Sequence, residues 1–205
     1  MLIIFGLRVL YRTLASGVFH CRRCGGDRQY HLRAGRRWFA LLFLPVIPLN
    51  AVGQHVRCTT CRTRYVTDVL GQPTTAQMQA ALLAGMRAAV SAMLRSGDPA
   101  SPAARRRAIE AVIGSGVPDY DEDMLMTDLG QPLDALRPAL NQVGAQLTVQ
   151  AREWYLADVI QIAMADGPLT DGERHAARSI GIDLGMTQAQ VIGVIAMTEE
   201  SAGRG

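Results

Sequence analysis

The segment Phe19-His20-Cys21-Arg22-Arg23-Cys24-Gly25-Gly26 places a cysteine on each side of a two-residue turn, and Cys58-Thr59-Thr60-Cys61 repeats that spacing. A C-x-x-C turn points two sulfur atoms at one position, so two such turns together supply four sulfur ligands. Four thiolates in a tetrahedron suit zinc and leave no open position for a reacting water. The sequence therefore predicts a structural zinc site, with iron on the same ligands as the chemical alternative.

Other uses of these cysteines fit the sequence less well. A redox-active thiol pair normally lies at the start of a helix in a βαβ setting, which this region lacks. His20 and His55 flank the two turns, and either could replace a ligand, pack against the sheet or face solvent. Gly25 and Gly26 permit the tight backbone of the first turn, and Gly53 is placed to form a turn before the second.

The charge of the chain is unevenly distributed. The 205 residues suit one or two domains, and about half of them are apolar. Eleven arginines accompany a single acid, Asp27, through residue 65, whereas acids outnumber arginines from residue 66 onward. A basic head of this kind favours anionic partners, which include nucleic acid, anionic lipid and the acidic half of the chain itself.

No apolar run reaches the length of about 18 residues that a membrane-spanning helix needs. The longest, Trp38–Leu49, is shorter and contains Pro45 and Pro48. Residues 1–7 lack the charged region and cleavage site of a signal peptide. We therefore expect a cytoplasmic protein, with a peripheral position at the membrane as the alternative.

The apolar run at 38–49 has two interpretations. It is either a buried strand with a turn or, with Arg36, Arg37 and Trp38 at its start, a surface that docks a partner or the membrane interface. Nucleic acid is a third partner that arginines and aromatic side chains favour.

The hydrophobic pattern of the sequence changes near residue 70. Short strand-like runs, broken by Gly and Pro, fill residues 1–70 and predict a small β-rich zinc ribbon. Residues 71–74 are the predicted linker, 75–198 a helical domain and 199–205 a flexible tail. The helical domain shows apolar stripes for about seven helices, and Pro138 predicts a kink or break in the fourth. The predicted fold class is therefore mainly all-α.

Helix starts are marked by residues whose side chains accept hydrogen bonds from backbone amides. Ser101 before Pro102, Thr148 and Thr187 are predicted N-caps. Capping boxes are predicted for Asp119 with Glu122 and for Thr170 with Glu173.

The turn from Asp166 to Glu173 carries three carboxylates, Asp166, Asp171 and Glu173. Carboxylates this close could bind a hard cation such as Ca²⁺, although the spacing is not that of an EF-hand. The alternative is a purely structural turn, in which Gly167 ends one helix and Thr170 with Glu173 caps the next.

The segment Ile162-Ala-Met-Ala-Asp166-Gly167-Pro-Leu-Thr-Asp-Gly-Glu173, followed by Leu184-Gly185-Met186-Thr187, resembles the TerB-like tellurite-resistance family. The resemblance spans about residues 75–198 and implies an all-helical domain of two similar halves. It also implies metal binding by Asp166 and Glu173. In the corresponding turn of the first half, Ser96 and Ala104 depart from the acidic pattern.

The head resembles a zinc-ribbon family found at the N-termini of bacterial proteins. Three segments carry the resemblance, and they are Phe5-Gly6, the knuckle from Phe19 to Gly25, and Phe43-Leu-Pro45-Val-Ile-Pro48. This resemblance favours a structural strand over a docking surface for residues 38–49.

No set of residues predicts catalysis. The sequence has no phosphate-binding loop, no nucleotide fingerprint and no convincing Ser-His-Asp or Cys-His arrangement, so no small-molecule substrate is expected. We expect a non-enzymatic metal-binding adaptor or scaffold that acts with protein partners. The TerB-like resemblance implies a bacterial stress or tellurite response. The alternative is a nucleic-acid-binding zinc ribbon regulated by its helical domain.

Overall fold

The computed structural model describes residues 5–41 and 44–203, and the chain forms two compact units, Met1–Gln77 and Met78–Gly205. The start of the first predicted strand run (residues 1–4), the last two tail residues, and Leu42 and Phe43 of the apolar run lie outside the described residues.

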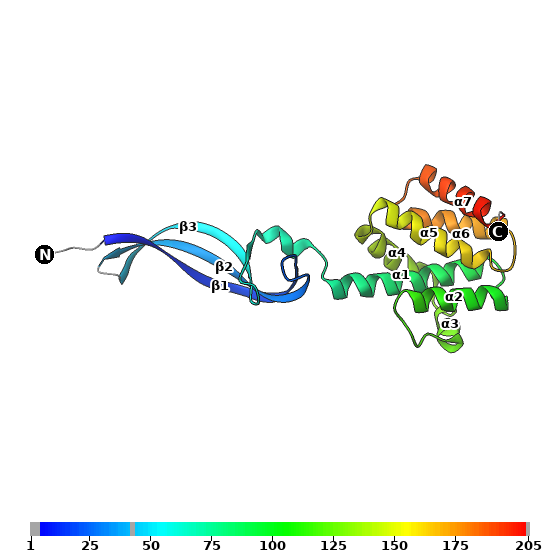
Figure 1. The fold of residues 1–205 in the computed structure, drawn as a ribbon, viewed down its shortest axis with the longest axis horizontal. Helices are drawn as coiled ribbons and strands as arrows, with labels where there is room; N and C mark the ends of the chain where they lie inside the picture. Colours follow the sequence, from blue (N-terminus) through cyan, green and yellow to red (C-terminus); the bar gives the residue numbers. More distant parts are fainter. Residues whose placement is uncertain (1–4, 42–43, 204–205) are drawn as a thin grey trace. The chain divides into compact units, whose positions relative to one another are not determined.

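The first unit is built on one antiparallel sheet with the strand order β1-β2-β3-β4 (Figure 1). Its strands are β1 (Phe5–Cys21), β2 (Gly26–Leu41), β3 (Leu44–Cys58) and the short β4 (Arg64–Tyr65). The prediction of a mainly all-α class is wrong, because the described residues combine this four-stranded sheet with seven α-helices and the class is mixed.

The glycines and prolines that divide the sequence into short runs lie inside long strands. Tyr30 packs over Gly17 and Tyr11 over Gly35, so that a Cβ on either glycine would crowd the ring. An aromatic ring over a strand glycine compensates for the missing side chain and keeps the strand in register. Pro45 and Pro48 belong to β3, which pairs with β4 only at Val56 and Arg57. In this part of the sheet β3 is an edge strand, where a missing amide is tolerated.

The second unit is helical. The short 3₁₀-helix η1 (Thr67–Gly71) and the first turn of α1 still belong to the first unit. The seven α-helices in the described residues are α1 (Thr75–Ser96), α2 (Pro102–Gly114), α3 (Glu122–Leu129), α4 (Leu133–Gln146), α5 (Val149–Ala163), α6 (Asp171–Asp183) and α7 (Gln188–Ala202). Helix α4 runs unbroken through Pro138, so a break there is ruled out. Helix α7 extends into the segment predicted to be the tail.

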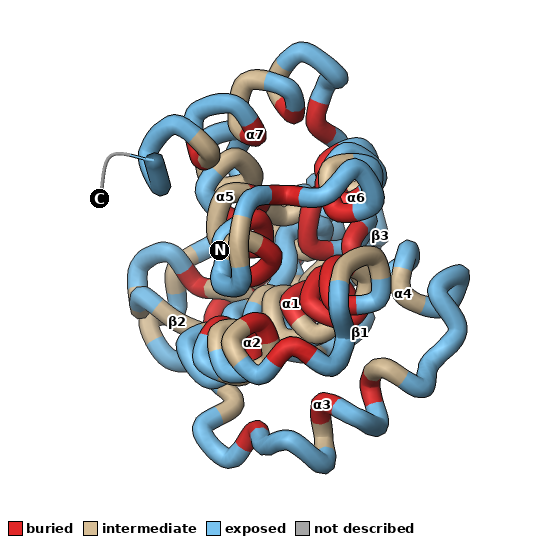
Figure 2. Tube along the Cα trace, turned by 90° about the vertical axis from the view of Figure 1, so that its right-hand side faces the viewer, coloured by how far each residue is buried: buried red, intermediate tan, exposed pale blue. Residues whose placement is uncertain are grey.

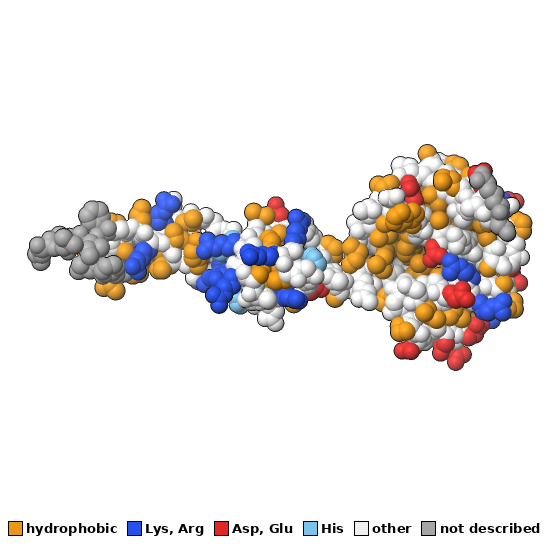
Figure 3. Space-filling view, in the orientation of Figure 1, with side chains coloured by type: hydrophobic (Ala, Val, Ile, Leu, Met, Phe, Trp, Pro, Cys, Tyr) orange, Lys and Arg blue, Asp and Glu red, His pale blue; other side chains and the backbone are white. Residues whose placement is uncertain are grey.

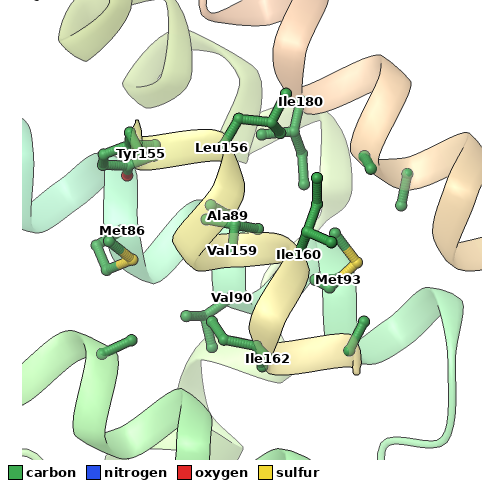
Figure 4. Close-up of a cluster of buried hydrophobic side chains, with 14 of the residues drawn as sticks. Met86, Ala89, Val90, Met93, Tyr155, Leu156, Val159, Ile160, Ile162 and Ile180 are labelled. Atoms are coloured by element: carbon green, nitrogen blue, oxygen red, sulfur yellow. The ribbon is translucent and has the colours of Figure 1, made fainter. Parts of the chain in front are cut away.

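The two units have separate hydrophobic cores. In the helical unit the buried residues lie on the facing sides of the helices (Figure 2). Val90 and Met93 of α1 are fully buried with Leu156 and Ile160 of α5 (Figure 4). The core of the sheet unit is much smaller and consists of Phe19, Cys21, Val56 and Cys58, with partly buried side chains around them.

Candidate metal centre

The four cysteines come together at one end of the sheet. Cys21 ends β1 and Cys58 ends β3, while Cys24 and Cys61 lie in the turns that follow. The four sulfur atoms all lie within 4.8 Å of one another, which is close enough for all four to bind one metal ion. Cys21 Sγ and Cys61 Sγ are 3.7 Å apart. A tetrahedron with metal–sulfur bonds of about 2.3 Å has edges of about 3.8 Å, so this spacing fits a tetrahedral ion.

Backbone hydrogen bonds shape both turns in the same way. The amides of Cys24 and Gly25 donate to the Cys21 carbonyl, and the Arg62 amide donates to the Cys58 carbonyl. The residue after the second cysteine of each turn has a left-handed backbone, with φ of 66° at Gly25 and 60° at Arg62. Glycine adopts this conformation at little cost, whereas a residue with a Cβ strains it. The second turn holds Arg62 in this strained conformation.

Hydroxyl groups surround the sulfur atoms. Tyr65 Oη lies 3.2 Å from Cys21 Sγ, and Thr63 Oγ1 lies 3.3 Å from Cys61 Sγ. Hydrogen bonds with the side chain and backbone of Thr63 lower the pKa of the Cys61 thiol to about 6. Burial opposes ionisation of Cys21, but the hydrogen bonds with Tyr65 and with the Cys24 backbone together outweigh it, so the pKa of Cys21 is also lowered. Thiolates are the form that binds metal, so both shifts favour binding.

The pKa of Cys24 shifts in the opposite direction, because no hydrogen bond offsets the effect of burial there. Desolvation and the neighbouring thiols raise the pKa of Cys24 to about 12, because several sulfur atoms cannot all carry charge in so small a space. A divalent cation removes this conflict by neutralising the charges that repel each other. The site is therefore arranged for a cation to complete it.

The aromatic side chains near the cysteines form one wall of the centre. Phe19 is buried and makes edge-to-face contacts with Tyr30 and Tyr65, at centroid distances of 5.7 and 5.5 Å.

Sequence spacing found the four cysteines but missed Thr63 and Tyr65. Neither residue has a signal in its own neighbourhood.

The two histidines near the turns lie outside the cysteine cluster. His20 Nδ1 lies 3.1 Å from Thr75 Oγ1 and 3.5 Å from Asp27 Oδ1. His55 stacks edge-to-face on Tyr11, and burial together with nearby arginines lowers its pKa. Both imidazole rings therefore contact side chains other than the cysteines.

The acidic turn of the helical unit is organised around a helix cap. The predicted capping box is confirmed, because the Thr170 amide and hydroxyl each donate to Glu173 Oε2 at 2.8 Å and the Glu173 amide donates to Thr170 Oγ1. Glu173 is buried and lies against Gly97 so closely that a Cβ there would collide with it. Asp166 and Asp171 are exposed, and binding of a second cation stays a prediction.

The predicted partner-binding residues lie next to one another in β2, but their side chains are on different faces of the sheet. Arg36 and Trp38 point to one face of the sheet and Arg37 to the other, because side chains alternate along a strand. Arg36 Nε donates to the Leu49 carbonyl across the sheet at 3.0 Å. On the face shown in Figure 3, apolar and basic side chains are spread along the described sheet, among other side chains and backbone.

A groove of about 640 Å³ lies in the helical unit. It is bordered by α1, α4, α6 and α7, and it contains His175, Ser179 and Asp183 at helical spacing on α6. Asp183 pairs with Arg137 of α4 at 3.1 Å, so its carboxylate is engaged in holding two helices together.

No protein-family model, curated protein or solved structure matches this chain. Among the described residues, no helix combines the length and the apolar character needed to cross a membrane.

Proposed function

We propose that the protein is a non-enzymatic adaptor in which the four cysteines bind one structural zinc ion. The observation that carries the proposal is the convergence of four sulfur atoms from two C-x-x-C turns within 4.8 Å. Zinc with four thiolates has a filled coordination shell and does not activate water. It would fix the end of a sheet whose own core contains only a few buried side chains.

The helical unit is the second part of the proposed adaptor, and we propose that it is of the TerB-like type. The supporting observation is the Asp166–Glu173 turn, with its capping box between α5 and α6. Asp183, one of the two carboxylates that line the groove, is engaged by Arg137. A bacterial stress or tellurite response is the setting that this resemblance implies.

Elemental analysis of the purified protein tests the zinc proposal. The wild type is compared with a Cys24→Ser, Cys58→Ser variant and with an Asp166→Asn, Glu173→Gln variant as the matched control. We expect about one zinc per chain, lost only in the cysteine variant. Wild-type protein prepared without chelators that contains no zinc, or contains iron, would overturn the proposal. A second cation lost only in the acidic variant would identify the turn as a separate site.

Nucleic-acid binding is the second candidate function. The observation that favours it is the placement of Arg33 and Arg64 over the Tyr11 ring, at 5.8 and 5.3 Å from its centroid. Salt-sensitive retention on nucleic acid, weakened when Arg36 and Arg37 are neutralised, is the result this candidate requires.

A further inference from the structure

At the end of the sheet opposite the cysteines, several of the described apolar side chains are exposed. Leu7, Leu41, Leu44, Val46 and Ile47, together called the apolar tip, have exposed fractions of 61, 40, 68, 56 and 52%. Scattered exposed leucines are ordinary on protein surfaces, but a contiguous apolar group marks a surface that binds something.

The strand register places most of the apolar tip on one face. Leu41 pairs with Leu44, and the next row across the sheet is Leu7, Phe39 and Ile47. Residues paired across strands point to the same side, and residues two apart along a strand do as well. The two rows therefore form one surface three strands wide.

Arginines follow on the same face, nearer to the cysteines. The row after Phe39 contains Arg37, and Arg33 lies four residues farther along β2. Arg64 of β4 reaches the same face, where its guanidinium lies over Tyr11. Arg33, Arg37 and Arg64 are called the basic band. Along its length, this face changes from apolar to basic.

The dimensions match those of a membrane interface. At a rise of about 3.4 Å per residue, the two apolar rows are about 7 Å apart and Arg37 lies about 7 Å beyond them. Interfacial elements bury their apolar side about 5–10 Å deep, with basic residues at the level of the headgroups. Trp38 is on the opposite face of the sheet, at a level between Arg37 and Phe39. This level corresponds to the boundary between headgroups and acyl chains, where tryptophan is enriched.

We infer that the apolar tip inserts into the surface of an anionic lipid bilayer while the basic band contacts the lipid headgroups. Charge favours this partner, because Asp27 is the only acid in the described parts of β1, β2 and β3, and it lies at the cysteine end. A second copy of the sheet would bring arginine against arginine. A nucleic-acid backbone would leave Leu44 and Ile47 without an apolar partner. The inference extends the proposed adaptor by naming its anchoring surface and does not depend on which metal is bound.

Vesicle sedimentation of the full chain tests the inference. The probes are phosphatidylcholine vesicles with and without about one third phosphatidylglycerol. A Leu44→Asp, Ile47→Asp variant removes part of the apolar tip, and an Arg33→Gln, Arg37→Gln variant weakens the basic band. Val18→Asp and Met197→Asp are matched controls, since both side chains are similarly exposed but lie outside the tip. Metal content and circular dichroism establish that each variant is folded.

We expect the wild type and both controls to bind the anionic vesicles, and binding by the tip variant to weaken at least about tenfold. The arginine variant should lose the preference for anionic lipid. In a Trp154→Phe background, the emission of Trp38 should shift to shorter wavelength when anionic vesicles are added.

Three results would overturn the inference. The first is a wild type that fails to bind anionic vesicles, and the second is a tip variant that binds as well as the controls. The third is tip-dependent dimerisation or nucleic-acid binding without vesicle binding, which would assign the surface to a different partner. All three leave the zinc measurement unaffected, so failure of this inference is distinguishable from failure of the proposed adaptor.

Discussion

Asp27 has a structural role that its sequence neighbourhood does not reveal. Its carboxylate accepts hydrogen bonds from the amides of Thr75 at 2.8 Å and Ala76 at 3.1 Å, the first residues of α1. The first amides of a helix have no partner within the helix, and a carboxylate placed there satisfies them and favours the positive end of the helix dipole. The single acid of the basic head is therefore used to cap a helix.

This contact predicts a dependence on pH. The hydrogen bond from the Thr75 amide lowers the pKa of Asp27, so the folded chain binds a proton less readily than the unfolded chain. The stabilisation is present at neutral pH and is lost as the pH falls below about 4, where an ordinary aspartate becomes protonated. In a pH titration of the metal-loaded protein, the amide NMR signals of Thr75 and Ala76 should shift with a midpoint below the ordinary carboxyl value.

Asp27→Asn should abolish this titration, and Asp68→Asn in η1 should leave it intact. Persistence of the titration in Asp27→Asn would mean that another group controls the start of α1.

A residue of the metal centre could be predicted only where a pattern within a few neighbouring residues identifies it. The cysteines were recognised because two residues of spacing are enough to aim two sulfurs at one point. Tyr65 and Asp27 were missed because each acts on a partner that is distant in the sequence. Thr63 lies only two residues from Cys61, but a threonine at that position carries no recognisable pattern. The strained backbone at Arg62 was also missed. In the first turn the left-handed position is occupied by a glycine, which indicates such a conformation, whereas in the second turn it is occupied by an arginine, which does not.

At the scale of elements, helix caps were the most predictable feature. Ser101, Thr148, Thr170 and Thr187 all accept the hydrogen bond expected of an N-cap, because this signal is contained within four residues. The box predicted at Asp119 was wrong by two residues, since Asp121 is the cap of α3 and both positions hold the same residue type.

Strand lengths were not predictable in the same way. A glycine normally weakens a strand, but Gly17 is paired with Tyr30 and Gly35 with Tyr11, whose rings compensate for the missing side chains. Gly53 was expected to form a turn, but its φ of 104° lies within β3, opposite Gly35, where the register shifts. These outcomes depend on partners in other strands.

Helices α4 and α6 meet at a glycine that has no room for a side chain. Gly144 of α4 is buried, and a Cβ there would overlap the backbone of Leu184 at the end of α6. Backbone atoms cannot move aside as a flexible side chain can, so the helices would have to separate. We expect Gly144→Ala to lower the free energy of unfolding by about 2–3 kcal/mol, measured by urea denaturation.

Gly193 of α7 is the control for this substitution, because nothing lies within 4 Å of the position of its Cβ. Gly193→Ala should raise the free energy of unfolding by about 0.5–1 kcal/mol, since alanine restricts the unfolded chain. Equal effects at the two positions would contradict the close approach of α4 to Leu184.

At the scale of the whole molecule, the two units depend on different forces. The helical unit buries a large apolar core contributed by most of its helices. In the sheet unit, Cys21 and Cys58 make up half of the four fully buried core residues, so the ligands of the proposed ion are also its core. Four cysteine side chains do not replace apolar packing, and binding of a metal is then part of the folding free energy of the sheet.

Removal of the metal should therefore unfold one unit and spare the other. Treatment with a strong chelator, or the Cys24→Ser, Cys58→Ser substitutions, should collapse the dispersed NMR amide signals of β1, β2 and β3. The signals of α2–α7 and the helical circular dichroism should persist, because their core contains no cysteine. Met93→Ala is the reciprocal variant, since it opens a cavity in the helical core, and it should cost that unit about 2–5 kcal/mol while leaving the metal bound. Loss of the helical signal on chelation, or release of metal by Met93→Ala, would show instead that the two units fold as one.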